Sequence, residues 1–367
     1  MSAQTAKCIA PTGAKRTRFR ETPLYEEGLW DLRNGLYAWM VPNGSWGESN
    51  AGLITGDGES LLIDTLWDLR YTQAMLDAMA PIFRKTPLTT LVNTHADGDH
   101  FWGNQLMGNE VESITSEAAR AEMDLHKPSS MLAFARLGNA LQAVPLKKVS
   151  KVGHWFSAMC LPYHFDEVIH TPATDTFSGS AWREVGGRRL QLIEVGPAHT
   201  TGDLMVYVPD ARTLFAGDIL FVGSTPVMWA GPVENWLRAL DLILDLDADT
   251  IVPGHGPVTD KSGVRTVKAY WEYTSGAARR LFDEGAPEQE AAHRIVQSAD
   301  FRKQSFANWD SPERMMTNVH VLYRHYKEKT GHMSLLAKVN MMRKQAMLAN
   351  ELPEAKPTMM RLEDASL

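Results

Sequence analysis

The sequence predicts an α/β protein, because segments typical of strands and of helices alternate along its first half. Residues 51–63 hold two apolar runs around a glycine-rich turn at 56–58, which is typical of a β-hairpin. Residues 66–79 have apolar side chains at helical spacing, and Pro81 is expected to close this helix. The apolar run at residues 88–92 then predicts a further strand.

A loop dense in metal-ligand residues follows that strand. Residues 93–100 read Asn-Thr-His-Ala-Asp-Gly-Asp-His, so two imidazoles and two carboxylates lie within six residues. On a tight loop, alternate side chains of this kind can converge on one point. A solvated polar turn is the alternative, but it does not explain why three later strand ends each carry a further ligand-type residue.

The three later segments share one pattern, in which an apolar or alternating run is followed by a small residue and then by His or Asp. The ligand-type residues are His199, Asp218 and His255. Glycine precedes two of them, and glycine lets the backbone turn sharply and approach an ion closely. Four such sites in one chain predict a metal centre.

In this order, the motifs resemble those of the metallo-β-lactamase-fold hydrolases. That family has an H-x-H-x-D-H loop, a later His, an Asp after a glycine, and a final His in a P-G-H-G type turn, and the match here runs from about residue 30 to about residue 260. The resemblance implies a four-layer αββα sandwich with a binuclear metal site at the edge of its two sheets. Carried over by position, the implied ligands are His95 and His199 for one ion, Asp99, His100 and His255 for the other, and Asp218 as the bridge.

One position departs from the family pattern, because Asp97 stands where the family usually has its second His. The resemblance implies two divalent ions, with zinc as the first expectation. Three carboxylates facing two ions lower the Lewis acidity and favour a harder metal such as iron or manganese. The loop is also similar to the H-x-E-x-D-H loop of flavodiiron proteins, which bind two irons. Asp97 has a short reach, so it is expected to ligate a shifted ion or to act through water, and a weak or empty first site is the alternative.

The expected chemistry follows from such a site. Water bound to a divalent ion loses several pKa units and becomes hydroxide near neutral pH. Asp99 is expected to orient this water or to accept its proton, and an ion would stabilise the oxyanion that forms on attack. We therefore expect hydrolysis of an ester, lactone, thioester or amide-like bond in a small molecule. A diiron redox enzyme supplied with electrons by a partner and a non-catalytic metal-binding scaffold are the alternatives.

Four residues are expected to hold the ligands in place through hydrogen bonds that fix imidazole tautomers and carboxylate orientations. They are Thr94, Thr200 and Asp203, together with Asp64, which resembles a family position that supports the metal loop. For Asp64, a cap on the following helix is an equally good interpretation. For Thr200 and Asp203, capping of a turn is at least as good.

Residues 121–172 lie between the ligand loop and His199 like an insertion, and this segment is rich in Met, aromatic residues and His. We expect this segment to form a lid over the metals and to give the substrate an apolar wall. The alternative is that its aromatic residues pack a small core of their own. The candidate pocket residues are Trp155, Phe156, Tyr163 and His170 from this segment, and Trp229 from a later loop.

The domain organisation predicted from the sequence has four parts. Residues 1–24 are polar and are expected to form a flexible arm. The αββα domain is expected over 25–260, a helical extension over 261–350, and a flexible tail over 351–367. Helices are predicted at 235–246, 262–284, 287–297, 312–330 and 334–348. The last of these has an apolar stripe that is expected to pack on its own domain, with a homodimer contact as the alternative.

Composition and charge restrict the expected partners and location. The chain has 367 residues, of which 44% are hydrophobic and 22% are charged, enough to bury a substantial core. A net charge of −7 gives no electrostatic reason to expect nucleic acid or an anionic membrane, so a small-molecule substrate is the expected partner. Two cysteines form no disulfide framework, and the sequence shows no signal-peptide-like or membrane-spanning run, so we expect a cytoplasmic protein.

Overall fold

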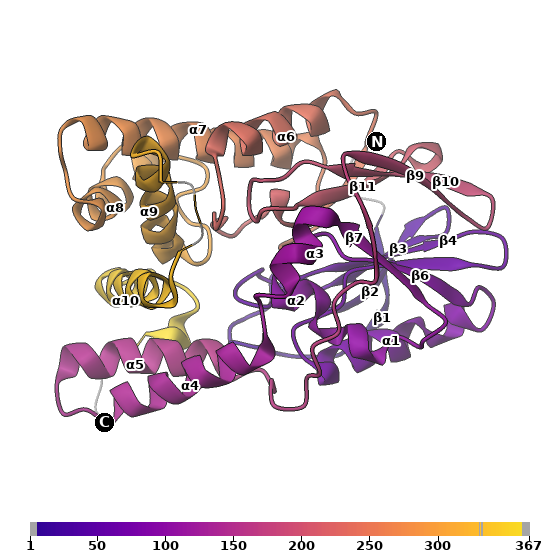
Figure 1. Ribbon diagram of the computed structural model, residues 1–367, viewed down its shortest axis with the longest axis horizontal. Coiled ribbons are helices and arrows are strands. Elements are labelled where there is room, and N and C mark those ends of the chain that lie inside the picture. Colours follow the sequence, from indigo (N-terminus) through magenta and orange to yellow (C-terminus); the bar gives the residue numbers. More distant parts are fainter. Residues whose placement is uncertain (1–5, 330, 332, 362–367) are drawn as a thin grey trace.

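The computed structural model describes residues 6–329, 331 and 333–361, and two β-sheets with helices on their outer sides form its central part (Figure 1). In Figure 1, α1 (Leu69–Phe83) lies below the sheets, whereas α6 (Val233–Asp245) and α7 (Lys261–Asp283) lie above them. The protein is therefore an α/β sandwich of the αββα type, as the resemblance implied.

The first sheet has eight strands in sequential order, β1 to β8. Its strands are β1 (Lys7–Pro11), β2 (Gly28–Arg33), β3 (Leu36–Met40), β4 (Ala51–Thr55), β5 (Ser60–Ile63), β6 (Leu88–Val92), β7 (Glu112–Ser116) and β8 (Asp175–Phe177). Pairing is antiparallel from β1 to β5 and parallel from β5 to β8. The expected hairpin at residues 51–63 is confirmed as β4 and β5.

The second sheet has five strands in the order β13-β12-β11-β10-β9. They are β9 (Ser180–Val185), β10 (Arg188–Glu194), β11 (Leu204–Val208), β12 (Thr213–Phe215) and β13 (Thr250–Val252). All pairs are antiparallel except β12 and β13, which run parallel. Because β6, β10, β12 and β13 each lead into a loop with a predicted ligand, the ends of these strands position the site.

The alternation of side chains along β5 shows why the two sheets stack. Leu61 and Ile63 lie in the apolar cluster between the sheets with Phe215 of β12, whereas Leu62 lies in the cluster beneath α1 with Met75. Successive side chains of a strand point to opposite faces, so a strand covered on both sides has a continuous apolar sequence. A shift of one residue would exchange the two layers, so burial of both faces fixes the register.

Of the remaining helices, α2 and α3 lie near the centre of Figure 1, and the others extend the sandwich on one side, at the left. Those before the second sheet are α2 (Gly98–Phe101), α3 (Glu117–Met123), α4 (Pro128–Gln142) and α5 (Lys147–Cys160). Those of the C-terminal region are α8 (Glu288–Gln297), α9 (Met315–Tyr326) and α10 (Leu335–Glu351), with 3-10 turns η5 (Phe301–Lys303), η6 (Pro312–Arg314) and η7 (Thr358–Met360). The expected helical C-terminal region is therefore present. Within the described residues, none of the helices has both the length and the apolar character needed to cross a membrane.

The expected helix end at Pro81 is wrong, because α1 continues through this proline to Phe83. Proline in the last turn removes a single backbone hydrogen bond, while the helix beyond it still gains from packing. Ile82 packs against the buried cluster beneath the first sheet, and the N–H of Arg84 still donates to the carbonyl of Ala80. Packing therefore outweighs the local signal.

The described part of the expected N-terminal arm is ordered, which corrects that prediction. Residues 7–11 form β1 and pair with β2, and Phe19 is only 1% exposed. Arg18 is buried in an ion pair with Glu27 at 3.2 Å. As an edge strand, β1 has exposed side chains at alternate positions, so its composition resembles that of a loop. Residues 1–5 of the expected arm lie outside the described residues.

The described part of the expected C-terminal tail also packs onto the molecule. Ala355 and Met360 are each 1% exposed, and the carbonyl of Met359 contacts Nε2 of His154 in α5 at 2.9 Å. The flexible tail expected over 351–367 is therefore wrong for residues 351–361, since burial of apolar side chains and hydrogen bonds such as that from the N–H of Thr358 to Glu21 hold this segment. Residues 362–367 lie outside the described part of the chain.

Candidate metal centre

The seven ligand-type side chains predicted from the sequence converge at the edge of the two sheets. They form three groups in which the ligand atoms lie within 4.8 Å of one another: His95, Asp97 and His199; His95, His100 and Asp218; and Asp99, His100 and His255. The four imidazoles are buried, and so is Asp218, whereas Asp97 and Asp99 are partly exposed. Loops from both sheets therefore bring their ligand atoms to one place, as metal coordination requires.

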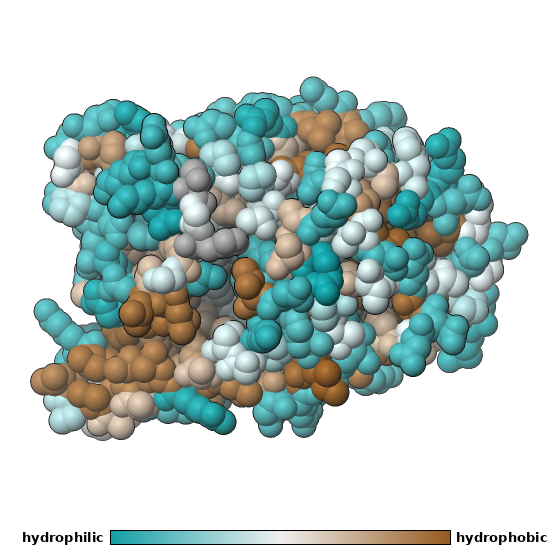
Figure 2. Space-filling view, viewed as in Figure 1, coloured by the Kyte–Doolittle hydropathy of each residue, from teal (hydrophilic) through white to brown (hydrophobic). Residues whose placement is uncertain are grey.

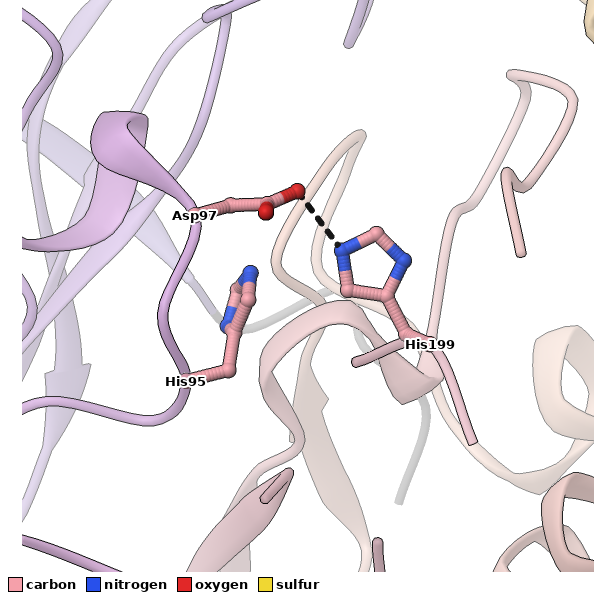
Figure 3. A group of neighbouring side chains, drawn as sticks. All are labelled: His95, Asp97 and His199. Atoms are coloured by element: carbon pink, nitrogen blue, oxygen red, sulfur yellow. Dashed lines mark hydrogen bonds and ion pairs between the residues drawn. The ribbon is translucent and has the colours of Figure 1, made fainter. Parts of the chain in front are cut away.

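The first group joins two residues of one loop to a residue of another (Figure 3). His95 and Asp97 follow β6, and His199 approaches from the loop after β10. The distance between Asp97 Oδ2 and His199 Nε2 is 3.1 Å. The indole N–H of Trp229 also donates to Asp97 Oδ2, at 2.8 Å. Asp97 is therefore close enough to share an ion with both imidazoles, and its carboxylate is held in that position by Trp229.

Asp218 lies between the groups. Its Oδ2 is 3.3 Å from His199 Nε2 and 3.4 Å from His255 Nε2, and its Oδ1 is 3.2 Å from His100 Nε2. In the third group, Asp99 Oδ2 lies 3.5 Å from His255 Nε2. A carboxylate in contact with imidazoles of both groups has the geometry that a bridging ligand needs.

The residues present fit a bound cation. Within the described part of the chain, His95 Nε2, His100 Nε2 and Asp218 Oδ1 are buried and have no hydrogen-bond partner, although Asp218 Oδ1 lies 3.2 Å from His100 Nε2. Buried polar atoms are normally satisfied, so three unpaired acceptor-type atoms that face one another point to an ion between them. The backbone at Gly254 comes close to one of these atoms: a Cβ added at Gly254 would lie only 1.9 Å from Asp218 Oδ1. The sharp turn before His255 therefore requires a residue without a side chain.

The electrostatics of the site also call for cations. Burial opposes the ionisation of its carboxylates, yet the charges and hydrogen bonds of neighbouring imidazoles outweigh burial. The pKa is consequently lowered for Asp97 beside His199, for Asp99 beside His100, and for Asp218 beside His255. Burial, reinforced by the nearby His100, lowers the pKa of His95 to about 3, so that this imidazole is neutral and free to ligate. Three buried or half-buried carboxylates of one charge need positive charge nearby.

Asp64 holds two elements of the ligand loop from behind. Its Oδ1 accepts the backbone N–H of Thr94 at 2.7 Å, and its Oδ2 accepts the Thr94 hydroxyl at 2.7 Å and contacts His100 Nδ1 at 2.9 Å. A carboxylate partner requires the proton on Nδ1, which leaves His100 Nε2 as a lone-pair donor facing the site. The N-cap of α1 is Asp68, so the capping alternative for Asp64 does not apply.

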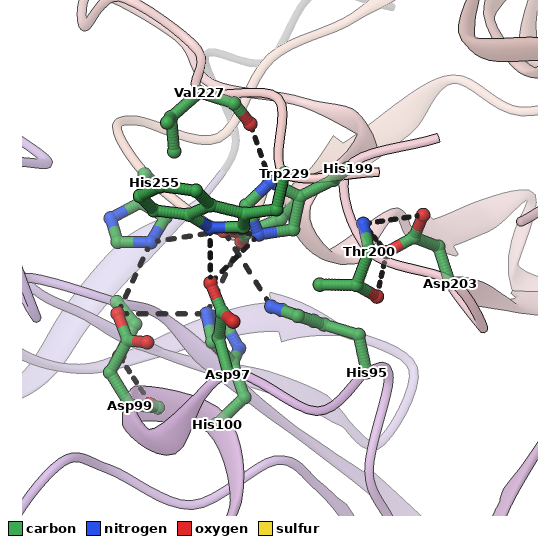
Figure 4. A network of polar contacts seen from close by, with 12 residues as sticks. His95, Asp97, Asp99, His100, His199, Thr200, Asp203, Val227, Trp229 and His255 are labelled. Carbon is green, nitrogen blue, oxygen red and sulfur yellow. Dashed lines mark hydrogen bonds and ion pairs between the residues drawn. The ribbon is translucent and has the colours of Figure 1, made fainter. Parts of the chain in front are cut away.

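The tautomers of two further imidazoles follow from the same reasoning. The Thr94 hydroxyl donates to Asp64, so its oxygen accepts the Nδ1–H of His95 at 2.9 Å. His199 Nδ1 donates to the Val227 carbonyl at 2.6 Å. In the neutral form of both rings, Nε2 therefore carries the lone pair and is directed at the site. Figure 4 shows these rings pointing toward one another beneath the indole of Trp229.

The C-terminal region supports the carbonyl that orients His199. Asn318 of α9 accepts the N–H of Met228 at 2.9 Å and donates to the carbonyl of Pro226 at 2.8 Å. These two bonds clamp the backbone on both sides of Val227. The helical extension is therefore coupled to a ligand of the first group.

Thr200 and Asp203 act on the turn and do not contact the ligand atoms. Asp203 accepts the N–H groups of Ala198 and Thr200 at 3.1 and 3.0 Å and the Thr200 hydroxyl at 2.7 Å. These bonds close the turn that presents His199, as visible at the right of Figure 4. The capping alternative thus describes the contacts of both residues.

A cavity of about 660 Å³ lies over the ligand residues. Asp97, Asp99, Asp218, His199 and His255 form its polar floor. Its walls are mostly apolar and include Trp46, Trp67, Trp102, Phe134, Trp229 and Met342. A polar floor with apolar walls is typical of a site that orients a small, largely apolar molecule.

Four of the expected pocket residues do not line this cavity, whereas Trp229 does. Trp155 and Phe156 are fully buried, and Phe156 stacks on Phe134 at 4.2 Å. The Tyr163 hydroxyl donates to the carbonyl of Trp46 at 2.5 Å, and His170 packs edge-on against Phe101. These four residues therefore pack a core, as in the alternative interpretation, but that core is shared with Trp46 and Phe101 from outside the insertion and is not the insertion's own.

The insertion still reaches the cavity, through Met131 and Phe134 of α4. The opposite wall includes Val339 and Met342 of α10, which belong to the apolar stripe seen in the sequence. At the beginning of that stripe, Leu335 and Leu336 are 73% and 82% exposed. Figure 2 shows hydrophobic colour at the lower left of this face, over α4, α5 and α10. Part of the stripe thus faces the cavity, which neither sequence interpretation anticipated.

Several polar residues of the cavity were not predicted from the sequence, and two of them lie beside the ligands. His126 Nδ1 lies 3.0 Å from the carbonyl of Ala96 and 3.6 Å from Asp97 Oδ1, and Arg314 reaches the wall from η6. Neither lies in one of the short strand-end patterns that pointed to the ligands, so only the fold brings them to the site. The apolar residues Trp46, Trp67 and Trp102 were missed for the same reason.

Fold and site together define a metal-binding α/β protein whose ligands gather at the edge of a two-sheet sandwich. The chain belongs to the metallo-beta-lactamase superfamily, whose family model matches residues 44–255. Most members of that superfamily are hydrolases.

Individual relatives are distant. The chain is similar to the 2,4-dinitroanisole O-demethylase subunit alpha of Nocardioides sp. (strain JS1661), with 23% identity over 77% of this chain and 70% of that subunit. It is 33% identical to the beta-lactamase-like protein 2 homolog of Caenorhabditis elegans, over 35% of this chain and 40% of that protein. Its fold is similar to that of the stereoselective inverting sec-alkylsulfatase of Pseudomonas sp., with a TM-score of 0.61, 17% identity, and coverage of 82% of this chain. The chain spans only half of the alkylsulfatase.

Proposed function

We propose that this protein is a metal-dependent hydrolase that cleaves an ester, lactone, thioester or amide-like bond in a small molecule with a large apolar part. The observation that carries the proposal is the position of the seven ligand-type side chains around the polar floor of an apolar cavity of about 660 Å³. The ligand atoms that have no other partner face a common centre, and substrate can reach that centre from the cavity.

The chain's own residues have distinct roles in this reaction. Two divalent ions held by these ligands would supply an acidified water and polarise the electrophilic group of the substrate. Asp99 lines the cavity, and Ser49 donates to its backbone carbonyl at 2.7 Å, which fixes the start of α2. Its carboxylate is ionised and partly exposed, so it can accept the proton of the attacking water. The tryptophans of the wall exclude bulk water and hold the apolar part of the substrate.

The distant relatives support small molecules with an apolar part as the first substrates to try. One is named for 2,4-dinitroanisole and another for sec-alkyl sulfates. Both kinds of molecule carry an apolar group bonded to oxygen. The cavity has aromatic walls and a floor of ligand-type residues, which suit such a molecule. A panel of aryl and alkyl esters, extended to thioesters and lactones, therefore tests the proposal directly.

We test the proposal with metal content and turnover measured on the same preparation. Elemental mass spectrometry on protein purified without chelators should give two divalent ions per chain, and that protein should hydrolyse activated esters. Asp218→Ala should lose more than about 100-fold in turnover, because even partners outside the ligand set commonly cost 10- to 100-fold. Asp166→Ala, at an exposed carboxylate, is the matched control. Turnover retained in Asp218→Ala would refute the metal mechanism.

A diiron redox enzyme is the second candidate, and Asp97 is the observation that favours it. A third carboxylate within 3.1 Å of an imidazole ligand makes the site harder and more suitable for iron than a histidine would. Two irons per chain, oxygen consumption with an added reductant, and no ester turnover would support this candidate over the hydrolase. Metal binding with neither activity would point to a scaffold.

A further inference from the structure

A buried guanidinium reaches the cavity from the C-terminal region. Arg314 ends η6 and is only 1% exposed, yet it lines the cavity together with Asp99, Asp218 and His255. It lies outside residues 44–255, which match the family model. Its role therefore has to be inferred from its contacts in this chain.

Two aromatic rings and one carbonyl hold the guanidinium in place. Its Cζ lies 4.6 Å from the ring centroid of Trp46 and 5.6 Å from that of Phe221. Phe221 in turn stacks on the imidazole of His255, with centroids 4.8 Å apart and planes at 5°. Nη1 donates to the carbonyl of Thr225 at 2.8 Å. Arg314 is thus a fixed group, one aromatic ring away from a metal-type ligand.

Arg314 lacks the anionic partner that a buried arginine normally has. Among the described residues, no carboxylate lies within ion-pair distance of it, and its buried Nε has no hydrogen-bond partner. Burial raises the pKa of the adjacent Glu313 to about 8, so Glu313 is mostly protonated at neutral pH, and that of Asp310 to about 6, so Asp310 stays mostly ionised but forms no ion pair with Arg314 within the described residues. A buried, unpaired cation is costly, whereas a ligand anion would offset that cost.

The charge of the loaded site favours the same kind of ligand. Two divalent ions more than neutralise the three carboxylates of the floor, and Arg314 adds a further positive charge beside them. Arg324, Lys329 and Lys338 also line the cavity. The walls between these charges are apolar, so the cavity suits a molecule that combines an oxyanion with an apolar body.

We infer that Arg314 binds an oxyanion of the substrate, a carboxylate or a sulfate-type group, so that the substrate class is an anionic ester with an apolar body. The Nε–Nη2 edge of the guanidinium carries no hydrogen bond in the described part of the chain, and this edge matches two oxygens of one anion. That the substrate is an ester rests on the proposed function, but binding of the anion can be measured without turnover.

The binding experiment compares two ligands of the same shape. Calorimetry on metal-loaded wild type is carried out with 4-phenylbutyrate and with its neutral amide, and wild type should prefer the carboxylate by about 10-fold or more. Arg314→Met should lose most of that preference while amide affinity reports on the intact cavity. Arg314→Lys keeps the positive charge but lacks the two parallel N–H donors of the guanidinium, so it should retain part of the preference for the carboxylate. Arg302→Met, at an exposed arginine of the same region, is the matched control.

Several outcomes would overturn the inference. Equal affinity of wild type for carboxylate and amide would do so without any variant. A preference kept in Arg314→Met would place the anion on the metal ions instead of the guanidinium. A parallel loss of carboxylate and amide affinity would show that Arg314 only supports the fold. If Arg314→Met does not fold, as judged by circular dichroism, an undiminished preference in Arg314→Lys would overturn the inference, whereas a reduced one would support it.

Turnover separates this inference from the proposed function. The ratio of kcat/KM for the mono-p-nitrophenyl ester of glutaric acid to that for p-nitrophenyl valerate should fall by about 10-fold or more in Arg314→Met. No turnover of any ester by wild type would refute the proposed function alone, and the calorimetric preference would still decide the role of Arg314.

Discussion

Replacing Asp64 by Asn should weaken metal binding without unfolding the protein. In the native site, Asp64 accepts from three donors, which are the N–H and hydroxyl of Thr94 and Nδ1 of His100. Either orientation of an amide would set its NH2 group against one of the two N–H donors. The backbone N–H of Thr94 cannot give up its proton, so the NH2 group is expected to face His100. The proton of His100 would then move from Nδ1 to Nε2, the atom that faces the candidate metal site. We expect metal affinity to fall 10- to 100-fold, or about 1.4–2.7 kcal/mol.

The control is Asp68→Asn, four residues away. Asp68 is also buried; its Oδ1 accepts the N–H of Tyr71 as the N-cap of α1, and its Oδ2 accepts from Arg70 and from the backbone N–H of His164. Asn keeps the cap but not the contacts of Oδ2, so this variant reports the cost of a buried Asp-to-Asn change that does not touch the ligands. Burial raises the pKa of Asp64, so replacing its charge costs the fold little, and the two variants should melt at similar temperatures. Affinity is measured by competition with a fluorescent chelator. An unchanged affinity in folded Asp64→Asn would refute the proposed tautomer of His100.

Three further predictions concern the ligand loop, the turn before His255 and a buried acid. Asp97→His should shift the metal preference toward zinc in elemental analysis, and an unchanged preference would show that Asp97 does not ligate. Gly254→Ala should reduce metal content at least several-fold, because the new Cβ would lie 1.9 Å from Asp218 Oδ1, whereas Gly108→Ala, in open space, should not. Burial raises the pKa of Glu313 from 4.5 to about 8, so the folded state binds the proton more tightly and wild-type stability should fall between about pH 5 and 8. Glu313→Gln should flatten that dependence in denaturant titrations, and an identical slope would contradict it.

The metal-binding residues could be predicted from the sequence because each lies in a short local pattern. His95 to His100 follow a strand directly, and a small residue precedes His199, Asp218 and His255. Strand ends in a two-sheet sandwich meet at one edge, so order along the chain was enough to bring these residues together. The orientation of His100 by Asp64 was one of two interpretations, and only the distances decide between them.

The cavity wall could not be predicted in the same way, because it depends on packing between distant segments. Met131 of α4 and Met342 of α10 line the same cavity, although more than half the length of the chain separates them in sequence. Trp155 and Phe156 also belong to the aromatic-rich segment, but they lie on a face of α5 that is buried beneath the cavity wall. Arg314 had no local signal at all, and the strand β1 was hidden by the exposed residues that an edge strand carries.

The clamp on residues 226–228 has a consequence for how the chain can be divided. Asn318 of α9 fixes the carbonyl that sets the proton of His199, although it lies more than sixty residues beyond the end of the family match. A shortened chain that keeps only the segment matching the family would retain all seven ligands and lose the support of one of them. The helical region thus supports the candidate metal centre, and a shortened chain designed to bind metal has to include it.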